Sequence, residues 1–285
     1  KFNLNSNIYW RRGQDLYLYN RQKPEIYRNL HIGNNIGAEI NGSYLSNFGT
    51  TGVGVEARKE FLASNNLGSR ERFVTQVFLE HHFAFFQNKL HFSPGISWAN
   101  YDTQGDFFYP GLDLGFDFND HHKIYGNVAK VSRIPTFTDL YYVSKTEKGN
   151  PDLLPENALS AEVGYRFQRD GFLAKASGFL RNSDNSIDWT KENQNDIWKA
   201  QNIGKIETKG IEVEFGQHFN SFVKSYSVGY TFLDSKAKEP QNLISRYVLE
   251  NLKHQFVAKL ENKFLKNFTS QLIYRYNERV TTGSY

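Results

Sequence analysis

The chain has 285 residues, with 34 Lys and Arg against 30 Asp and Glu, a formal net charge of +4 and a mean hydropathy of −0.61. Its charges are interspersed without a basic cluster, so we expect no nucleic-acid partner. No run of about 18 apolar residues is present, which excludes a transmembrane helix, and the absence of cysteine excludes disulfides and thiolate metal sites.

Apolar and polar side chains alternate in segments along the whole chain, the pattern of β-strands with one apolar and one polar face. In 157–168, for example, Leu159 and Val163 share one face, and Glu162 lies on the other. The strands predicted in chain order are 1–12, 29–44, 51–62, 72–86, 89–101, 107–118, 122–133, 157–169, 172–188, 205–217, 221–234, 250–265 and 268–280. These make about thirteen strands, each near or above the roughly 9–11 residues that cross a bilayer at a tilt.

The connections between these strands alternate in length. Short turns are expected near 47–49, 87–88, 119–120, 170–171, 220 and 266–267. Longer loops are expected at about 13–28, 63–71, 134–156, 190–204 and 235–249. The connection at 102–106 departs from the rule, because it is short where a long loop is due. Short turns on one rim and long loops on the other are typical of bacterial outer-membrane barrels, and phenylalanines beside the short turns suggest an interfacial girdle.

Cationic residues within the strands are expected to face a lumen, because a Lys or Arg on the lipid face costs about 2–4 kcal/mol at the bilayer midplane. The residues are Arg166, Lys175, Arg181, Lys259 and Arg275. The strand that starts at Phe172 fits least well, since Leu173 and Phe179 then share the inward side of Lys175. The predicted fold class is all-β: an antiparallel up-and-down transmembrane β-barrel, partial, with about thirteen strands of a larger barrel.

Two proline-anchored pieces lie in the long loop 134–156. The first is Arg133-Ile134-Pro135-Thr136, and the second is Gly149-Asn150-Pro151-Asp152-Leu153-Leu154-Pro155-Glu156. Each proline fixes its own φ and shifts the preceding residue towards extended geometry. The second half of the loop is therefore expected to lead into strand 157–169 at a set angle.

The stretch SRIPTFTDLYY followed by GNPDLLPENALSAEVGY resembles the pattern found late in the barrels of TonB-dependent outer-membrane receptors. The later KGIEVEF (209–215) is similar to a strand motif of the same family. The residues that carry the family motif are Arg133, Pro135, Asn150, Pro151, Leu154, Pro155 and Glu156. The resemblance implies a barrel of about 22 strands around a plug in the bacterial outer membrane, in contact with its lipid. It also implies a receptor rather than an enzyme, energised by TonB acting on the plug.

Methionine is absent as well, and the chain begins within a predicted strand. We therefore expect residues 1–285 to be one domain, a piece of the receptor barrel. On the resemblance, further strands are expected before Lys1 and after Tyr285. The plug and the segment that engages TonB are expected to lie outside this sequence.

Candidate ligand contacts are the aromatic residues of the predicted long loops, because Tyr and Trp combine flat contact area with a polar group. They are Tyr17, Tyr19, Tyr27, Tyr141, Tyr142, Trp189 and Trp198, with Tyr141 and Tyr142 favoured because prolines bound their loop. For any single residue, packing within the loops or an upper aromatic girdle is the alternative role.

The ligand class is narrowed by what the loop lacks. Haem receptors of this family carry a His between the two motifs, and 134–150 contains none. The lack of Met weakens a soft copper ligand. A ferric siderophore or cobalamin remains as the expected ligand, and no resident cofactor or metal is expected.

Two other functions compete with a receptor. A passive porin-like channel would share the barrel features but not the two motifs. An outer-membrane enzyme would need a cluster of reactive groups, and Asp120-His121-His122 with Ser132 is the only tempting one. Adjacent residues on a strand point to opposite faces, so this cluster cannot form a triad by itself.

Overall fold

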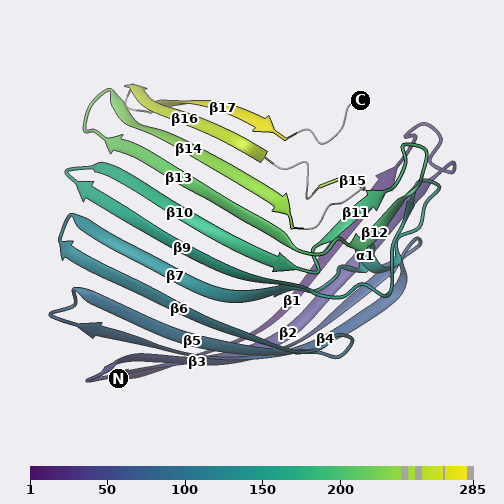
Figure 1. Ribbon diagram of the computed structural model, residues 1–285, viewed down its shortest axis with the longest axis horizontal. Coiled ribbons are helices and arrows are strands. Elements are labelled where there is room, and N and C mark those ends of the chain that lie inside the picture. Colours follow the sequence, from purple (N-terminus) through teal and green to yellow (C-terminus); the bar gives the residue numbers. More distant parts are fainter. Residues whose placement is uncertain (239–242, 248–251, 266, 281–285) are drawn as a thin grey trace.

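The computed structural model describes residues 1–238, 243–247, 252–265 and 267–280. Thirteen strands form one antiparallel sheet in which neighbours along the chain are neighbours in space. They are β1 (Phe2–Leu18), β2 (Arg28–Ser46), β3 (Gly49–Ser64), β4 (Gly68–Phe85), β5 (Leu90–Tyr101), β6 (Gly105–Asn119), β7 (His122–Arg133), β9 (Glu156–Arg169), β10 (Phe172–Asp184), β13 (Ile206–His218), β14 (Val223–Ala237), β16 (Leu252–Leu265) and β17 (Phe268–Arg279). The sheet curls into an open, partial barrel with β1 and β17 at its edges (Figure 1). The predicted all-β barrel fold is confirmed.

The strand register explains the two-sided pattern of the sequence. Lys175 on β10 lies opposite Arg166 on β9 and Glu214 on β13, so the three side chains share one face. Outward-facing Leu159 and Val163 on β9 are 53% and 63% exposed. On these strands the charged side chains thus face the concave interior, and Leu159 and Val163 face the convex surface.

Short turns lie along one rim of the sheet and most of the longer loops along the other (Figure 1). Asp170 and Gly171, with φ of 48° and 80°, make the two-residue turn between β9 and β10, and such positive φ values suit the twist of a tight hairpin. Exposed aromatic rings lie at this rim. The centre of the Phe264 ring is 4.8 Å from that of Phe222 and 5.8 Å from that of Phe268.

Two long loops of the prediction are wrong, because the strands run further than their apolar alternation. Strand β1 continues to Leu18 and pairs with β2 as far as Arg28, so the loop 13–28 is reduced to 19–27. Strands β3 and β4 pair up to Ser64 and Gly68, which leaves a tight turn instead of the loop 63–71. Backbone pairing sustains these hairpins beyond the expected membrane-spanning part, where no apolar face marks them.

The predicted strand 172–188 is also wrong. Strand β10 ends at Asp184, and Asn185 takes a left-handed φ of 54° that turns the chain out of the sheet. Parts of three predictions lie outside the described residues: positions 239–242 and 248–249 of the loop 235–249, the first two residues of strand 250–265, and residue 266 of the last turn.

A second, smaller sheet lies at the long-loop rim in the order β15-β11-β12-β8. Its strands are β8 (Glu147–Lys148), β11 (Ile187–Lys191), β12 (Trp198–Asn202) and β15 (Ile244–Ser245), and the short helix α1 (Phe137–Tyr141) lies beside them (Figure 1). Strands β12 and β8 pair in parallel. Within the described residues, the chain has no helix both long and apolar enough to cross a membrane.

Candidate functional site

The small sheet and helix α1 form a packed unit that we call the loop platform: residues 134–155, 185–203 and Ile244–Ser245. Its core contains Leu140, Leu153, Ile187, Trp189 and Ala200, and Tyr141, Tyr142 and Trp198 pack against it. Two loops that are separate in sequence are therefore one folded body with its own apolar interior. Burial of this kind is what keeps long loops in a single conformation.

Asp139 anchors helix α1 to the rest of the platform. Its carboxylate accepts from the backbone N–H of Thr136 at 3.1 Å, while the Thr136 hydroxyl accepts from the Asp139 N–H, which makes a capping box. The same carboxylate accepts from Trp189 Nε1 at 3.3 Å and pairs with Arg133 at 3.3 Å. One buried acid thus joins the helix, β7 and β11.

Glu156 ties the platform to the barrel wall. Its side chain is only 12% exposed and pairs with Arg133 at 3.4 Å and Arg181 at 3.2 Å. It also accepts from the backbone N–H of Ile187 at 3.1 Å. Two guanidinium partners and one amide partner offset part of the cost of burying this carboxylate.

The other family-motif residues also have structural positions. Pro135 is fully buried, and its carbonyl accepts from Arg72 at 3.0 Å. At Gly149 a Cβ would lie 2.9 Å from backbone atoms of helix α1, so the close approach requires glycine. Asn150 donates its N–H to the carbonyl of Asp139 at 2.9 Å.

The exposed end of the motif is fastened through its backbone. Leu154 is 57% exposed, but both its N–H and its carbonyl bond to the Asn202 side chain at 2.9 Å. Pro151 is exposed and Pro155 half-buried beside it. The motif therefore builds the platform and joins it to β9.

The platform reaches across the concave side to the hairpins of β1–β2 and β3–β4. Asn66 donates to the Val143 carbonyl at 2.8 Å and accepts from the Val143 N–H at 3.3 Å. The Arg70 guanidinium lies 3.7 Å from the centre of the Tyr141 ring. These contacts join segments about eighty residues apart in sequence, so the long-loop rim is spanned by side chains as well as by the sheet.

A cleft of about 710 Å³ opens where the platform meets the β1–β2 hairpin. We call it the tyrosine cleft, and its lining residues are Tyr17, Tyr19, Ile26, Tyr27, Asn29, Tyr142, Ser144, Lys145, Thr146 and Glu147. Tyr17 lies directly opposite Asn29 in the register of β1 and β2, so both face inward. Four of the aromatic residues proposed from the sequence thus share one cleft.

The tyrosine hydroxyls in the cleft form a small network with Asn29. Tyr27 and Tyr142 hydroxyls lie 3.3 Å apart, and the Asn29 amide donates to them at 3.2 and 3.5 Å. Burial and the hydrogen bond to Tyr27 raise the pKa of Tyr142 to about 12. The hydroxyl of Tyr142 therefore stays neutral at physiological pH.

The remaining sequence candidates lie elsewhere. Trp189 is 8% exposed within the platform core, and Tyr141 is half-buried under Arg70. The cations of Lys191 and Arg246 lie 4.9 and 5.5 Å from the centre of the Trp198 ring. No sequence signal marks Ile26, Asn29, Lys145 or Glu147, because only the tertiary contact between two distant loops brings them together.

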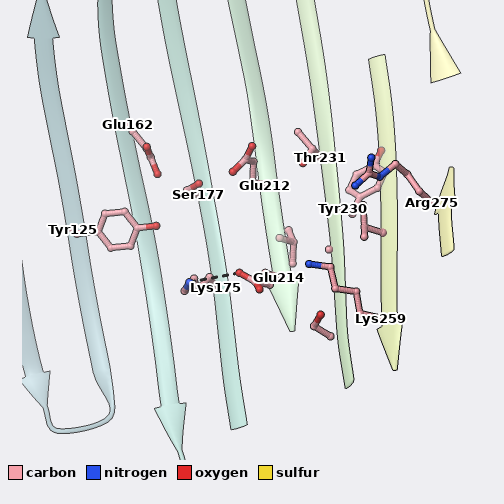
Figure 2. A pocket seen from close by; sticks show the side chains of 14 residues that line it. Tyr125, Glu162, Lys175, Ser177, Glu212, Glu214, Tyr230, Thr231, Lys259 and Arg275 are labelled. Atoms are coloured by element: carbon pink, nitrogen blue, oxygen red, sulfur yellow. Dashed lines mark ion pairs between the residues drawn. The ribbon is translucent and has the colours of Figure 1, made fainter. Parts of the chain in front are cut away.

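A second cleft, of about 450 Å³, lies on the inner wall. Figure 2 shows Glu162, Glu212 and Glu214 facing it together with Lys175, Lys259 and Arg275. Lys175 and Glu214 pair at 3.5 Å. The expected inward placement of these three cations is confirmed, and the wall is polar with charges of both signs.

The Asp120-His121-His122 cluster does not assemble a reactive site. His121 bonds to the Gln168 carbonyl at 3.1 Å and His122 to the Tyr165 hydroxyl at 2.5 Å. Ser132 instead donates to Asn157 at 2.6 Å. No group of three or more His, Cys, Asp or Glu suited to a metal ion is found in the part of the chain that the structure describes.

Comparison with known proteins places these features in context. The family model described as TonB dependent receptor-like, beta-barrel matches residues 1–284. The vitamin B12 transporter BtuB of Vibrio vulnificus (strain CMCP6) is 25% identical over 235 residues, which cover 80% of this chain and 36% of that protein. The ferrienterobactin receptor of Escherichia coli (strain K12) is 25% identical over 141 residues, 42% of this chain and 19% of that one.

Solved structures show the same fold. The siderophore receptor PirA from Pseudomonas aeruginosa superposes with a TM-score of 0.70 at 17% identity, over 88% of this chain and 47% of that one. PirA from Acinetobacter baumannii gives a TM-score of 0.67 at 15% identity, over 87% and 42%. The chain thus spans less than half the length of these relatives.

Proposed function

The chain belongs to the β-barrel family of the TonB-dependent receptors, and from this premise we propose that it forms wall and ligand-facing loops of a receptor that takes up a ferric siderophore or cobalamin. Proteins of this family are transport receptors of the bacterial outer membrane, so the chain lies in that membrane with its apolar convex face against lipid.

The observation that carries the proposal is the ordered loop platform with its tyrosine cleft. A rigid scaffold that presents aromatic side chains at the rim of a barrel suits the capture of a large amphiphilic ligand. Of the sequence candidates, we propose Tyr17, Tyr19, Tyr27 and Tyr142 as the contact surface and Trp198 as a second one. Trp189 and Tyr141 then support that surface from within. Two relatives, a vitamin B12 transporter and a ferrienterobactin receptor, support the ligand class.

Energy from TonB is the second part of the proposal. We propose that the receptor's barrel holds a plug domain and that TonB acts on it. The charged inner wall supports this, because Glu162, Glu212 and Lys259 suit a polar protein partner better than an apolar one. A passive porin-like channel is the alternative.

Uptake measurements separate the two functions. Cells with and without the receptor would be given radiolabelled ferric siderophores and cobalamin, in strains with and without TonB. We expect receptor-dependent uptake of one of these ligands that disappears without TonB. Uptake that continues at the same rate without TonB would support the passive channel and contradict the proposal.

A further inference from the structure

We infer that the tyrosine cleft selects a metal chelate of zero net charge that carries carbonyl oxygens on its surface, and discriminates against a polyanionic chelate. The inference rests on the proposed function and narrows its ligand class. Ferric tris-hydroxamates and corrinoids with amide side chains share this chemistry. Ferric tris-catecholates, which keep three negative charges, do not.

The charge of the cleft lining favours a neutral ligand over a trianion. Lys145 and Glu147 are the charged side chains that line the cleft, and together with Arg246 beside Glu147 they carry one net positive charge. Glu147 is paired with Arg246, whose pKa this hydrogen bond raises. A trianion would find one lysine to replace its hydration, in a lining that also contains four tyrosine rings and an isoleucine. Transfer of a multiply charged group without compensating partners is costly, whereas a neutral chelate loses little.

The network of Tyr27, Asn29 and Tyr142 contains more hydrogen-bond donors than it uses. The two N–H groups of the Asn29 amide serve the two tyrosine oxygens, and one hydroxyl bonds to the other. Two hydroxyl hydrogens are present, so one donor is not used within this network. A donor of this kind matches a carbonyl oxygen, and Tyr142 does not ionise near neutral pH to repel it.

The exposed apolar area of the cleft favours the same kind of ligand. Tyr17, Tyr19 and Ile26 are 52%, 70% and 56% exposed and line the opposite side of the cleft from the platform residues. Rings and an aliphatic side chain at this exposure gain from covering a large apolar surface. A neutral chelate with methylene or ring carbons on its surface offers such an area, while a trianion keeps its water.

Competition binding to the intact receptor in outer membranes tests the inference. The probes are ferrichrome as the ferric tris-hydroxamate, cyanocobalamin as the amide-bearing corrinoid, and ferric enterobactin as the tris-catecholate. We expect one of the two neutral probes to bind at least about tenfold more tightly than ferric enterobactin, and the one that binds identifies the source. Tightest binding of ferric enterobactin would overturn the inference and leave the proposed receptor function standing. Uptake without TonB would instead overturn the proposed function.

Two variants probe the cause of the selectivity. Thr146→Lys adds a cation to the lining, and we expect the affinity ratio to shift about tenfold towards ferric enterobactin. Thr146→Gln is its matched control, with added size but no charge, and should leave the ratio unchanged. If both variants shift the ratio equally, charge is not the cause.

Tyr142→Phe removes one hydroxyl of the network. We expect binding of the preferred neutral probe to weaken about fivefold to tenfold. Tyr226→Phe, near the short-turn rim, is the control and should have no effect. Unchanged binding in Tyr142→Phe would remove the hydroxyl donor from the argument.

Discussion

The barrel wall and the loop platform are both built from β-strands, but different interactions hold them. In the wall, each of the thirteen strands pairs with its neighbours in the sheet over 8 or more residues, and many large apolar side chains are exposed. In the platform, strands of two to five residues from different loops meet around a buried core. The wall depends on its backbone ladder, whereas the platform depends on its side chains.

The two regions are therefore sensitive to different substitutions. A wall strand tolerates many side chains, provided that charge stays on the inner face. The platform has few backbone hydrogen bonds to spare and is held by Asp139, Glu156 and the ring of Trp189. Substitutions should therefore affect the two regions separately.

The largest expected effect is that of Trp189→Ala. Loss of the buried ring and of its hydrogen bond to Asp139 should destabilise the platform by about 3–5 kcal/mol. Amide hydrogen exchange in residues 187–202 should accelerate by at least about a hundredfold, while amides of β9 and β10 keep their rates. Trp10→Ala, at a ring that is 68% exposed, is the control. Equal acceleration in the wall would show that the two regions unfold together.

A charge on the outer face of the wall comes next. Val163 lies near the middle of β9 and faces outward, so Val163→Arg should lower the free energy of unfolding in lipid bilayers by about 2–4 kcal/mol. Ser177→Arg is the matched variant, because Ser177 faces the inner cleft between Glu162 and Glu212. It should change the free energy of unfolding by under about 1 kcal/mol. A similar loss in both variants would contradict the assignment of faces.

A smaller effect is expected from Glu156→Gln. The change leaves Arg181 without its carboxylate partner, leaves Arg133 with Asp139 alone, and weakens the bond to the Ile187 N–H. Because both arginines are partly exposed, the cost should be about 1–3 kcal/mol and confined to the platform. Hydrogen exchange at the Ile187 amide measures it. Glu214→Gln, which breaks the half-exposed pair with Lys175, should leave that amide unaffected.

The smallest effect is the titration of Tyr142. Its pKa is raised from 10.0 to about 12 in the folded state, so the folded protein holds this proton when the unfolded chain has lost it. The associated stability is fully present below pH 10 and is lost as the pH rises towards about 12. The difference in absorbance at alkaline pH between the native receptor and Tyr142→Phe should show the raised midpoint. A midpoint at the ordinary value would show that Tyr142 is open to solvent.

The wall could be predicted from the sequence because its pattern is local. In β9 and β14 every second residue reports the same environment, so the period of two identifies the strand and both of its faces. Beyond the expected membrane-spanning part this signal ends. The outer half of β1 stays paired, but the polar run from Arg11 to Asp15 interrupts its apolar alternation, so the sequence predicts a loop there.

The platform could not be predicted in the same way. Its strand β8 has two residues, and β11 ends near the turn at Asn193. Its core joins Leu140, Leu153 and Trp189, whose proximity depends on contacts between separate loops. The prolines predict that the second half of the loop 134–156 leads into β9 at a set angle, but the partner loop 185–203 carries no comparable signal. For the same reason, the sequence identifies Tyr17 and Tyr142 as loop aromatics but does not place them in one cleft.

The contacts of residues 135–143 with Arg72, Asn66 and Tyr27 have a mechanical consequence. They link the segment that follows β7 to hairpins that lie three to six strands away from β7 along the curved sheet. These contacts act as a cross-brace, because they fix the distance across the curved sheet at the long-loop rim. At the opposite rim the described residues form only short turns, so the bend there is set by strand twist alone. The long-loop rim is thus the braced end of the molecule.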